Sequence, residues 1–254
     1  MEIVALRGDP EASFRFASVS KLLVATAALV AYEEGTVDLD EPAGPPGSSL
    51  RHLLAHASGL ATDKPESVAP PGTRRIYSNA GIEAVADHLE ARLGRPWSAL
   101  VSETVLGPAG LGQTTVSQDL SAAWGAVGSL NDLLALGTEL LVPTVLLEST
   151  LELATEVAFP GLPGVVPGVG RYEDCAWGLG FEVKGHKRPH WTATGASVRT
   201  FGHFGQSGAF LWVDPEAGVA AAVGGGAKFG PWALRCWPAF SDAVLSEFAE
   251  KGSA

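Results

Sequence analysis

Residues 14–23 read Phe-Arg-Phe-Ala-Ser-Val-Ser-Lys-Leu-Leu, and this stretch decides how the rest of the chain is interpreted. Apolar residues over 17–34 keep a helical spacing, and Gly35 stands where a left-handed residue commonly ends a helix. Within this predicted helix Ser18 and Lys21 are three residues apart, so their side chains lie on one face and can meet. Ser18 also falls in the first turn, where backbone N–H groups are free to bind an anion.

This pairing suggests a nucleophile and its base. A serine hydroxyl is a weak nucleophile until a nearby group removes its proton. Lys21 has the apolar neighbours Leu22 and Leu23, and desolvation by such residues lowers the pKa of an amine so that it can act as a base. Ser20 points about 100° away from Lys21 along the helix, which makes it the weaker nucleophile candidate. The structural alternative is a serine that caps a helix beside a lysine in water.

A second segment could bring a phenol and an amide to the same place. Tyr77 and Asn79 lie between a proline-bearing loop, 62–75, and a predicted helix, 80–93, so their side chains can project into a cleft. A lysine ammonium beside the Tyr77 phenol would help it lose its proton and make it a second base. The Asn79 amide can bind a substrate carbonyl or hold the lysine. The alternative is a buried tyrosine followed by a helix cap.

A third segment, 202–208, reads Gly-His-Phe-Gly-Gln-Ser-Gly. Glycines in an edge strand let a ligand approach the backbone closely. The N–H groups of this strand could therefore supply half of an oxyanion hole. The alternative is a bend in a glycine-rich strand that carries a structural histidine.

The order of elements along the chain predicts a discontinuous fold. After a short strand at 3–6 and the first helix, further helices are expected at 50–57, 80–93, 96–106 and 129–142, and an irregular crossing at 156–170. Strands are expected at 177–183, 197–203, 209–214 and 219–223, followed by an amphipathic helix over 231–251. We therefore expect an α/β domain formed by residues 1–17 and 171–254, an inserted, mainly helical domain of residues 18–170, and a site in the cleft between them.

Composition limits the partners that the protein can have. The 254 residues are 46% hydrophobic and 18% charged, which is enough for a sizeable core, and the formal net charge is −11. Because binding to nucleic acid needs clustered lysine and arginine, no nucleic-acid partner is expected. No apolar run reaches the roughly 18 residues that indicate a membrane-spanning helix.

The start of the chain and the cysteines bear on location. The first residues lack the basic segment and long apolar run of a secretory signal, so a cytoplasmic protein is expected if Met1 is the natural start. In a reducing cytoplasm, Cys175 and Cys236 are expected to stay separate buried thiols.

Two further groups of residues have ordinary interpretations. Lys184, Lys187 and Arg188 form a basic run, which is expected to be a solvated hairpin tip. His52 and His56 are four apart on a predicted helix, which is a spacing that metal ligands use. Because no third ligand is evident, no metal and no other cofactor is expected.

Taken in order, Ser-x-x-Lys at 18–21, Tyr-x-Asn at 77–79 and His-x-Gly at 203–205 resemble the motifs of the serine β-lactamase, penicillin-binding-protein and class C-like esterase superfamily. Residues 33–42 and 51–60 are also similar to stretches of these proteins, and the resemblance covers nearly the whole chain. It implies an α/β, β-lactamase/transpeptidase-like fold, with an antiparallel sheet flanked by terminal helices and an inserted all-helical domain. It also implies a hydrolase that acts through an acyl-enzyme.

The resemblance implies a role for each matching position. Ser18 would attack a carbonyl, and Lys21 and Tyr77 would share the proton transfers. The backbone N–H groups of Ser18 and Gln206 would stabilise the oxyanion, and Asn79 would orient the substrate or Lys21. The third motif would add further substrate contacts, from His203, Phe204 and Gly205.

The chain departs from the family in three respects: its third motif, its short N-terminus, and a helical domain that is expected to be short and to cover the substrate less. His203 stands where true β-lactamases have the lysine of Lys-Thr-Gly, and a neutral imidazole weakens recognition of a carboxylate. Phe204 would add an apolar wall, and both changes favour uncharged esters or amides over penicillins. No Glu-x-x-x-Asn segment of the class A kind is placed to activate a deacylating water. Only 17 residues precede Ser18, so the sheet is expected to lack a strand, and the edge left open could serve dimerisation.

Three functions follow from these features, all with a small-molecule ligand. An esterase-type serine hydrolase acting on esters or amides is favoured. A β-lactamase or D-amino-acid peptidase is the alternative among enzymes, and a non-catalytic penicillin-binding-like module is the alternative outside them. Monomer and homodimer both remain open.

Overall fold

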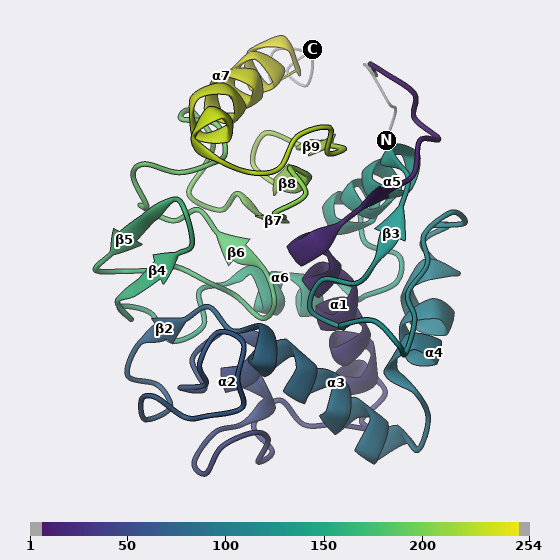
Figure 1. The fold of residues 1–254 in the computed structure, drawn as a ribbon, viewed down its shortest axis with the longest axis vertical. Helices are drawn as coiled ribbons and strands as arrows, with labels where there is room; N and C mark the ends of the chain where they lie inside the picture. The colour runs from purple at the N-terminus through teal and green to yellow at the C-terminus, as the bar shows by residue number, and fades with distance from the viewer. Residues whose placement is uncertain (1–6, 249–254) are drawn as a thin grey trace.

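The computed structural model describes residues 7–248 of the chain (Figure 1). The strand expected at 3–6 and the last residues of the helix expected at 231–251 lie outside the described residues. Among residues 7–248, no helix combines the length and the apolar composition that crossing a bilayer requires.

A four-stranded antiparallel sheet forms the C-terminal part of the fold, as expected, in the order β6-β7-β8-β9. Its strands are β6 (Glu182–Val183), β7 (Phe201–Phe204), β8 (Phe210–Asp214) and β9 (Val219–Val223). The strand expected from 177 begins only at Glu182, because Gly178 donates a hydrogen bond to the Phe181 carbonyl and closes a turn. No strand from residues 7–17 joins this sheet.

Helices cover both faces of the sheet (Figure 1). One face packs against α7 (Pro231–Phe248) through an aromatic core that includes Trp191, Phe204, Phe210, Trp212 and Trp237. The other face packs against α5 (Leu130–Leu141) and α1 (Ser20–Glu33). Since successive side chains of a strand point to opposite faces, neighbouring residues of β7 and β8 enter different cores.

The helix α1 lies at the centre of the molecule (Figure 1). Its residues from Ser20 to Ala31 are all buried, so it is enclosed around its whole circumference rather than having one face in water. The surrounding helices are α2 (Leu50–Leu54), α3 (Asn79–Leu93), α4 (Trp97–Val101) with the π-helical turn η2 (Ser102–Leu106), and α6 (Glu148–Thr155). Of these, α6 was not expected from the sequence.

Two small sheets tie loops to this framework. The first pairs β1 (Phe14–Arg15) with β3 (Val127–Gly128), just before Ser18. The second joins β2 (Arg75–Ile76), β4 (Gly164–Val166) and β5 (Gly170–Tyr172), so the crossing expected to be irregular at 156–170 contains one short strand, and a second begins at its end. The division into an α/β domain and an inserted helical domain stays a prediction, although α5, from the middle of the chain, packs on the sheet.

Of the basic run that was expected to be a solvated hairpin tip, only Arg188 is exposed, whereas both lysines are buried. The side chains of Lys187 and Glu182 are both fully buried, with the Lys187 Nζ 2.7 Å from a Glu182 carboxylate oxygen. His190 and the Trp191 indole also hydrogen-bond to this carboxylate, and Lys184 is buried as well. Burial alone would raise the pKa of Glu182, but the Lys187 charge and the His190 hydrogen bond hold that pKa well below its usual range. The expectation was wrong for the two lysines because a local charge pattern does not reveal a buried counter-charge.

Glu182→Gln is therefore expected to lower the free energy of unfolding by about 3–5 kcal/mol, because it leaves the Lys187 charge buried without a counter-charge. Urea unfolding at pH 7 measures the change. The matched control is Glu103→Gln, which breaks an ion pair between exposed side chains, Glu103 and Arg95, and should cost less than about 1 kcal/mol. Similar small effects of the two substitutions would contradict a charged, water-excluded pair.

The two cysteines are not bonded to each other, which confirms that they are separate thiols. Cys175 is buried as expected, whereas Cys236 is exposed.

Candidate active site

Ser18 lies in a single 3₁₀ turn, η1 (Ala17–Val19), that leads directly into α1. Ala17 has a φ of +48°, a left-handed conformation that is uncommon for a residue with a side chain and often marks a functional site. Gly205, at the end of β7, lies against this turn. A Cβ at Gly205 would be 2.4 Å from the Phe16 carbonyl oxygen and 3.2 Å from the Ser18 nitrogen, so only glycine allows the approach.

Lys21 is held by three oxygen atoms. Its Nζ is 3.3 Å from the Ser18 Oγ and 2.8 Å from both the Asn79 Oδ1 and the Ala123 carbonyl oxygen. The last two atoms can only accept hydrogen bonds, so they engage two N–H groups of the amine. A neutral amine has two N–H groups and one lone pair, and the lone pair is therefore left to face the Ser18 hydroxyl.

The surroundings of Lys21 favour this neutral form. The side chain is completely buried, and burial lowers the pKa of Lys21 to about 7, although the charges of Glu83 and Asp63 act in the opposite direction. Near neutral pH both protonation states are thus accessible, as a group that takes up and returns a proton requires.

Tyr77 faces the same two residues. The Lys21 Nζ lies 4.9 Å from the centroid of its ring, and its hydroxyl shares a hydrogen bond with Ser18. Burial raises the pKa of Tyr77 above its ordinary value, and the hydrogen bond to Ser18 offsets this only in part. The expectation that the phenol loses its proton more easily is therefore wrong for the free site, because burial raises its pKa. Its role as a second base stays a prediction. At neutral pH the phenol keeps its proton and can donate it.

The side-chain oxygen of Asn79 is hydrogen-bonded to Lys21. It is the first residue of α3, whose N-cap Ser78 accepts a hydrogen bond from the Gly81 amide. The Asn79 Oδ1 accepts from Lys21, and the Nδ2 donates to an Asp63 carboxylate oxygen at 2.7 Å. Of the two possibilities left open by the sequence, the structure shows the amide holding Lys21.

Two backbone amides remain available beside Ser18. Neither the Ser18 nor the Gln206 N–H donates a hydrogen bond within residues 7–248. Gln206 follows Gly205, which packs against the Ser18 turn, in a turn where the Gly208 amide bonds to the Gly205 carbonyl. The oxyanion hole at these two amides stays a prediction. The Ser18 turn and the segment that begins at Gly205, which carry the two N–H groups, are in contact.

His203 is buried and uncharged. Its Nδ1 is 2.7 Å from the Phe204 carbonyl oxygen, so that nitrogen carries the proton and the Nε2 carries a lone pair. Burial, together with the nearby Lys21 charge, lowers the pKa of His203 to about 3. Its ring centroid is 5.8 Å from that of Tyr77. The third motif therefore lies beside the other two and presents a neutral imidazole to them.

Phe204 does not line the site. Its ring packs against Trp191, Phe229 and Trp237 in the aromatic core beneath α7. Because β7 alternates its side chains, His203 points to the site and Phe204 to the opposite face. The prediction that Phe204 adds an apolar wall to the cleft is therefore wrong.

The loop at 120–126 completes the site and was missed in the sequence. Ser121 and the amides of Ala122 and Ala123 hydrogen-bond to the Glu83 carboxylate, which fixes the loop so that the Ala123 carbonyl faces Lys21. Trp124 follows with 44% of its surface exposed. A main-chain carbonyl leaves no signal in a sequence, but a single tryptophan among small residues could have drawn attention to this loop.

The two histidines four residues apart have different partners. The His52 Nδ1 hydrogen-bonds with the Ser49 hydroxyl and accepts from the Ser49 amide at the start of α2. The His56 Nδ1 accepts from the Ser78 amide instead. Their metal-like spacing thus serves two separate contacts with the backbone.

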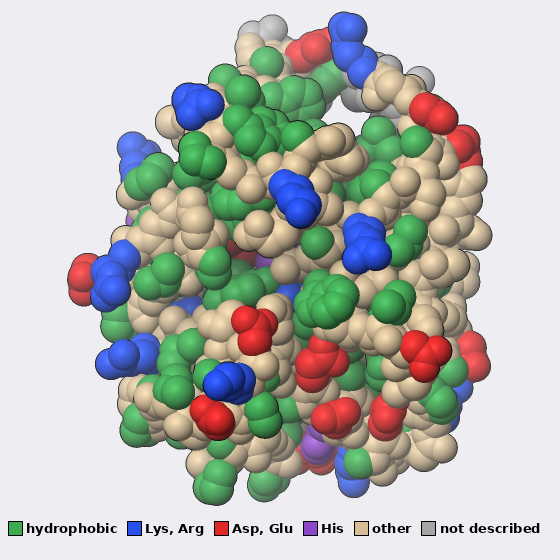
Figure 2. Space-filling model, viewed as in Figure 1, with side chains coloured by type: hydrophobic (Ala, Val, Ile, Leu, Met, Phe, Trp, Pro, Cys, Tyr) green, Lys and Arg blue, Asp and Glu red, His purple; other side chains and the backbone are tan. Residues whose placement is uncertain are grey.

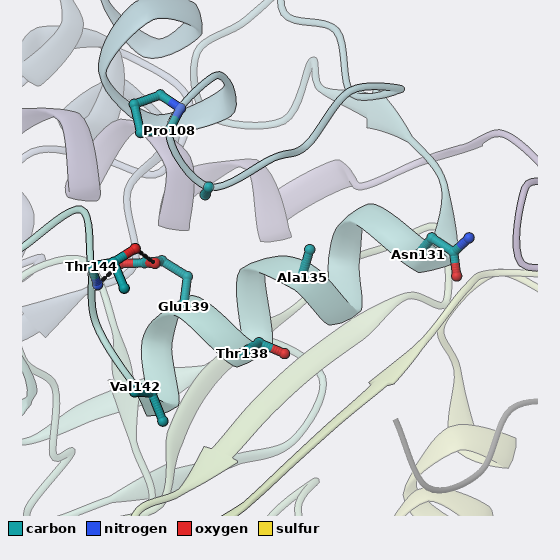
Figure 3. Close-up of a pocket in the computed structure, with 8 residues that line it drawn as sticks. Pro108, Asn131, Ala135, Thr138, Glu139, Val142 and Thr144 are labelled. Carbon is teal, nitrogen blue, oxygen red and sulfur yellow. Dashed lines mark hydrogen bonds between the residues drawn. The ribbon is translucent and has the colours of Figure 1, made fainter. Parts of the chain in front are cut away.

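A groove of about 530 Å³ lies elsewhere, along α5 (Figure 3). Its one carboxylate, Glu139, accepts hydrogen bonds from the amides of Thr144 and Val145 and from the Thr144 hydroxyl. None of the residues that line it is a lysine, histidine or cysteine, so the groove offers no base beside a nucleophile. The candidate active site is therefore the one around Ser18.

Comparison with known proteins shows the family to which the chain belongs. A family model described as "Beta-lactamase" matches residues 7–224. The crystal structure of a β-lactamase from Mycobacterium bovis is 48% identical in sequence, with a TM-score of 0.95 over 97% of this chain and 91% of that one. Unliganded simvastatin synthase (LovD) from Aspergillus terreus is 18% identical, with a TM-score of 0.77 over 96% of this chain and 86% of that one, a likeness of fold alone.

One curated relative is a D-alanyl-D-alanine-carboxypeptidase/endopeptidase, AmpH of Escherichia coli (strain K12). It is 25% identical over 177 residues, which are 52% of this chain and 46% of that protein. The chain therefore spans about half the length of the curated relatives it matches.

Proposed function

The chain belongs to the β-lactamase family of serine hydrolases, and from this premise we propose that it hydrolyses uncharged esters or amides through an acyl-enzyme on Ser18. The observation that carries the proposal is the geometry of Lys21. Its two N–H groups are taken by Asn79 and Ala123, which leaves its lone pair to accept the Ser18 proton.

In the first half-reaction the Ser18 proton moves to Lys21 as the Ser18 oxygen bonds to the substrate carbonyl carbon. The negative charge passes to the carbonyl oxygen, which the amides of Ser18 and Gln206 stabilise; loss of one such donor typically costs about 3–4 kcal/mol of barrier. The protonated phenol of Tyr77 donates to the leaving group as its bond to carbon breaks. The proton on Lys21 then passes to Tyr77, which restores both groups.

The second half-reaction repeats these steps with water in place of Ser18. Lys21 takes a proton from the water, whose oxygen bonds to the acyl carbon. The Ser18 oxygen leaves as a hydroxyl with a proton supplied by Tyr77. The use of the same groups in both directions follows from microscopic reversibility.

Preference for uncharged substrates is supported by the electrostatics of the site. The neutral His203 replaces a permanent cation, so a carboxylate gains no ion pair there. Asp63 and Glu83 lie near Lys21, and acidic side chains gather over the helical half of the face shown in Figure 2. An anionic substrate would meet unfavourable charge on approach. The exposed Trp124, next to Ala123, offers an apolar contact instead.

Hydrolysis of β-lactams is the second candidate, because the Mycobacterium bovis protein with 48% identity is described as a β-lactamase. The two candidates share the same acyl-enzyme chemistry. They differ in whether the site accepts a carboxylate beside the scissile bond.

Two aryl acetates, phenyl acetate and 3-carboxyphenyl acetate, separate these candidates, since the second adds only a carboxylate on the leaving group. We expect kcat/KM to be at least about tenfold higher for the uncharged ester, a difference of about 1.4 kcal/mol, and nitrocefin to be a poor substrate. A preference for the carboxylate ester, together with rapid nitrocefin hydrolysis, would instead support β-lactam hydrolysis as the function.

Labelling by a fluorophosphonate tests the serine-hydrolase proposal before any substrate is known. Mass spectrometry is expected to place the adduct on Ser18. A folded protein that takes no label would favour a non-catalytic binding module.

A further inference from the structure

His56 contacts the segment around Tyr77 at three points. Its backbone carbonyl accepts a hydrogen bond from the Ile76 amide at 2.9 Å, and its Nδ1 accepts one from the Ser78 amide at 3.1 Å. Its ring centroid lies 4.8 Å from that of Tyr77. One residue thus ties down the amides on both sides of the tyrosine and also contacts its side chain.

We propose that His56 is a positioning residue that holds the Tyr77 phenol at Ser18 for proton donation to the leaving group. The inference rests on the proposed function, because it assigns a task within the same reaction. His56 makes no hydrogen bond to Ser18 or Lys21, so it acts through Tyr77.

The hydrogen bond from Ser78 fixes the protonation of His56. Because an N–H group donates to the Nδ1, that nitrogen carries the lone pair and the proton is on the Nε2. Burial, with the Lys21 charge, lowers the pKa of His56 well below its usual value. A protonated ring would point an N–H group at the Ser78 N–H, so the neutral form is the one that holds the segment.

The arrangement costs stability, which is a sign of a functional constraint. His56 has a φ of +53°, a left-handed conformation, and its Nε2 is buried without a hydrogen-bond partner in residues 7–248. The Trp177 Nε1 and the His203 Nε2 are also buried without a hydrogen-bond partner among the described residues. The rings of His56, Trp177 and His203 all lie within 6 Å of the Tyr77 ring, so they leave the phenol little freedom to turn.

Substitutions of His56 by side chains of related chemistry distinguish a role in positioning Tyr77 from a role in filling space. In His56→Asn the Oδ1 can replace the Nδ1 as acceptor for Ser78, and asparagine tolerates a left-handed backbone. In His56→Gln the side-chain oxygen lies one carbon further from the backbone and does not reach the Ser78 N–H group. His56→Ala removes the acceptor and the ring together. His52→Ala is the control, because His52 caps α2 and has no contact with Tyr77.

The test is a double-mutant cycle with Tyr77→Phe, using kcat and KM for phenyl acetate. We expect His56→Ala and His56→Gln to lower kcat about 10- to 100-fold with little change in KM, and His56→Asn and His52→Ala to stay within about fivefold of wild type. In the Tyr77→Phe background, whose own kcat should be about 100-fold down, the His56 substitutions should add less than about threefold.

Two results would overturn the proposal. One is an equal loss from His56→Ala or His56→Gln in both backgrounds, since a merely structural role lowers activity whether or not the phenol is present. The other is a His56→Asn variant as impaired as His56→Gln. If His56→Ala fails to fold, the His56→Asn and His56→Gln pair gives the same decision. Failure of the proposed function itself would be seen separately, as an unlabelled wild-type protein.

Discussion

Ser18→Ala is expected to lower kcat/KM for phenyl acetate by about 10⁴- to 10⁶-fold, because no other hydroxyl can take its place in the acyl-enzyme. The activity left would come from substrate binding and from the backbone amides at Ser18 and Gln206. Labelling by the fluorophosphonate should disappear together with turnover. Steady-state kinetics and intact-mass spectrometry measure the two losses.

Ser20→Ala is the control for this experiment. The Ser20 hydroxyl is in the same stretch but is buried and accepts a hydrogen bond from the Ala126 amide at 3.0 Å. Its loss should lower the free energy of unfolding by about 1–3 kcal/mol, because the Ala126 amide is left unsatisfied, while labelling at Ser18 continues. If Ser18→Ala kept its label and Ser20→Ala lost it, Ser20 would be the nucleophile.

Lys21→Met is expected to lower the acylation rate about 10²- to 10⁴-fold, since it removes the base while keeping a side chain of similar length. In the wild type, the active form has a neutral Lys21 with a pKa of about 7. The acylation rate should therefore rise tenfold per pH unit below pH 7 and level off above it. Pre-steady-state measurements between pH 5 and 9 follow this profile, and a flat wild-type profile would exclude Lys21 as the base.

The same pKa links stability to pH. Burial lowers the pKa of Lys21 from 10.5 to about 7 on folding, so the unfolded chain binds more protons between these two values. The contribution of Lys21 to the free energy of unfolding therefore rises with pH across this window. The stability of wild type relative to Lys21→Met should increase from pH 7 to pH 10 in denaturant titrations. A difference that stays constant with pH would show that Lys21 is not desolvated.

Local patterns in the sequence determined the framework that carries the site. The helix expected at 80–93 is observed as Asn79–Leu93 and ends at Gly94, which has a φ of +68°. The helix expected from 17 is observed as η1 and α1 over 17–33. Both were predictable because caps and helical spacing depend on residues a few positions apart.

Predictions failed where the deciding neighbour is distant in the chain. The Tyr77 phenol was expected to lose its proton more easily, but burial among rings such as Trp177 and His203 raises its pKa. The carbonyl that directs the Lys21 lone pair belongs to Ala123, 102 positions away. Phe204 was wrongly assigned to the cleft. The face of the sheet to which its side chain points depends on how β7 is placed in the sheet, and the sequence does not show this.

The sequence by itself determined the helices, the antiparallel C-terminal strands and the Ser18–Lys21 pair one turn apart, since each is set by spacing along the chain. Only the tertiary structure decided which groups are charged. It buries Lys21 and His203, which lowers the pKa of both, and it places Lys187 against Glu182, which holds the pKa of Glu182 well below its usual range. The physical reason is that the free energy of a charge depends on all the surrounding dielectric and counter-charges, which come together only when the chain has folded.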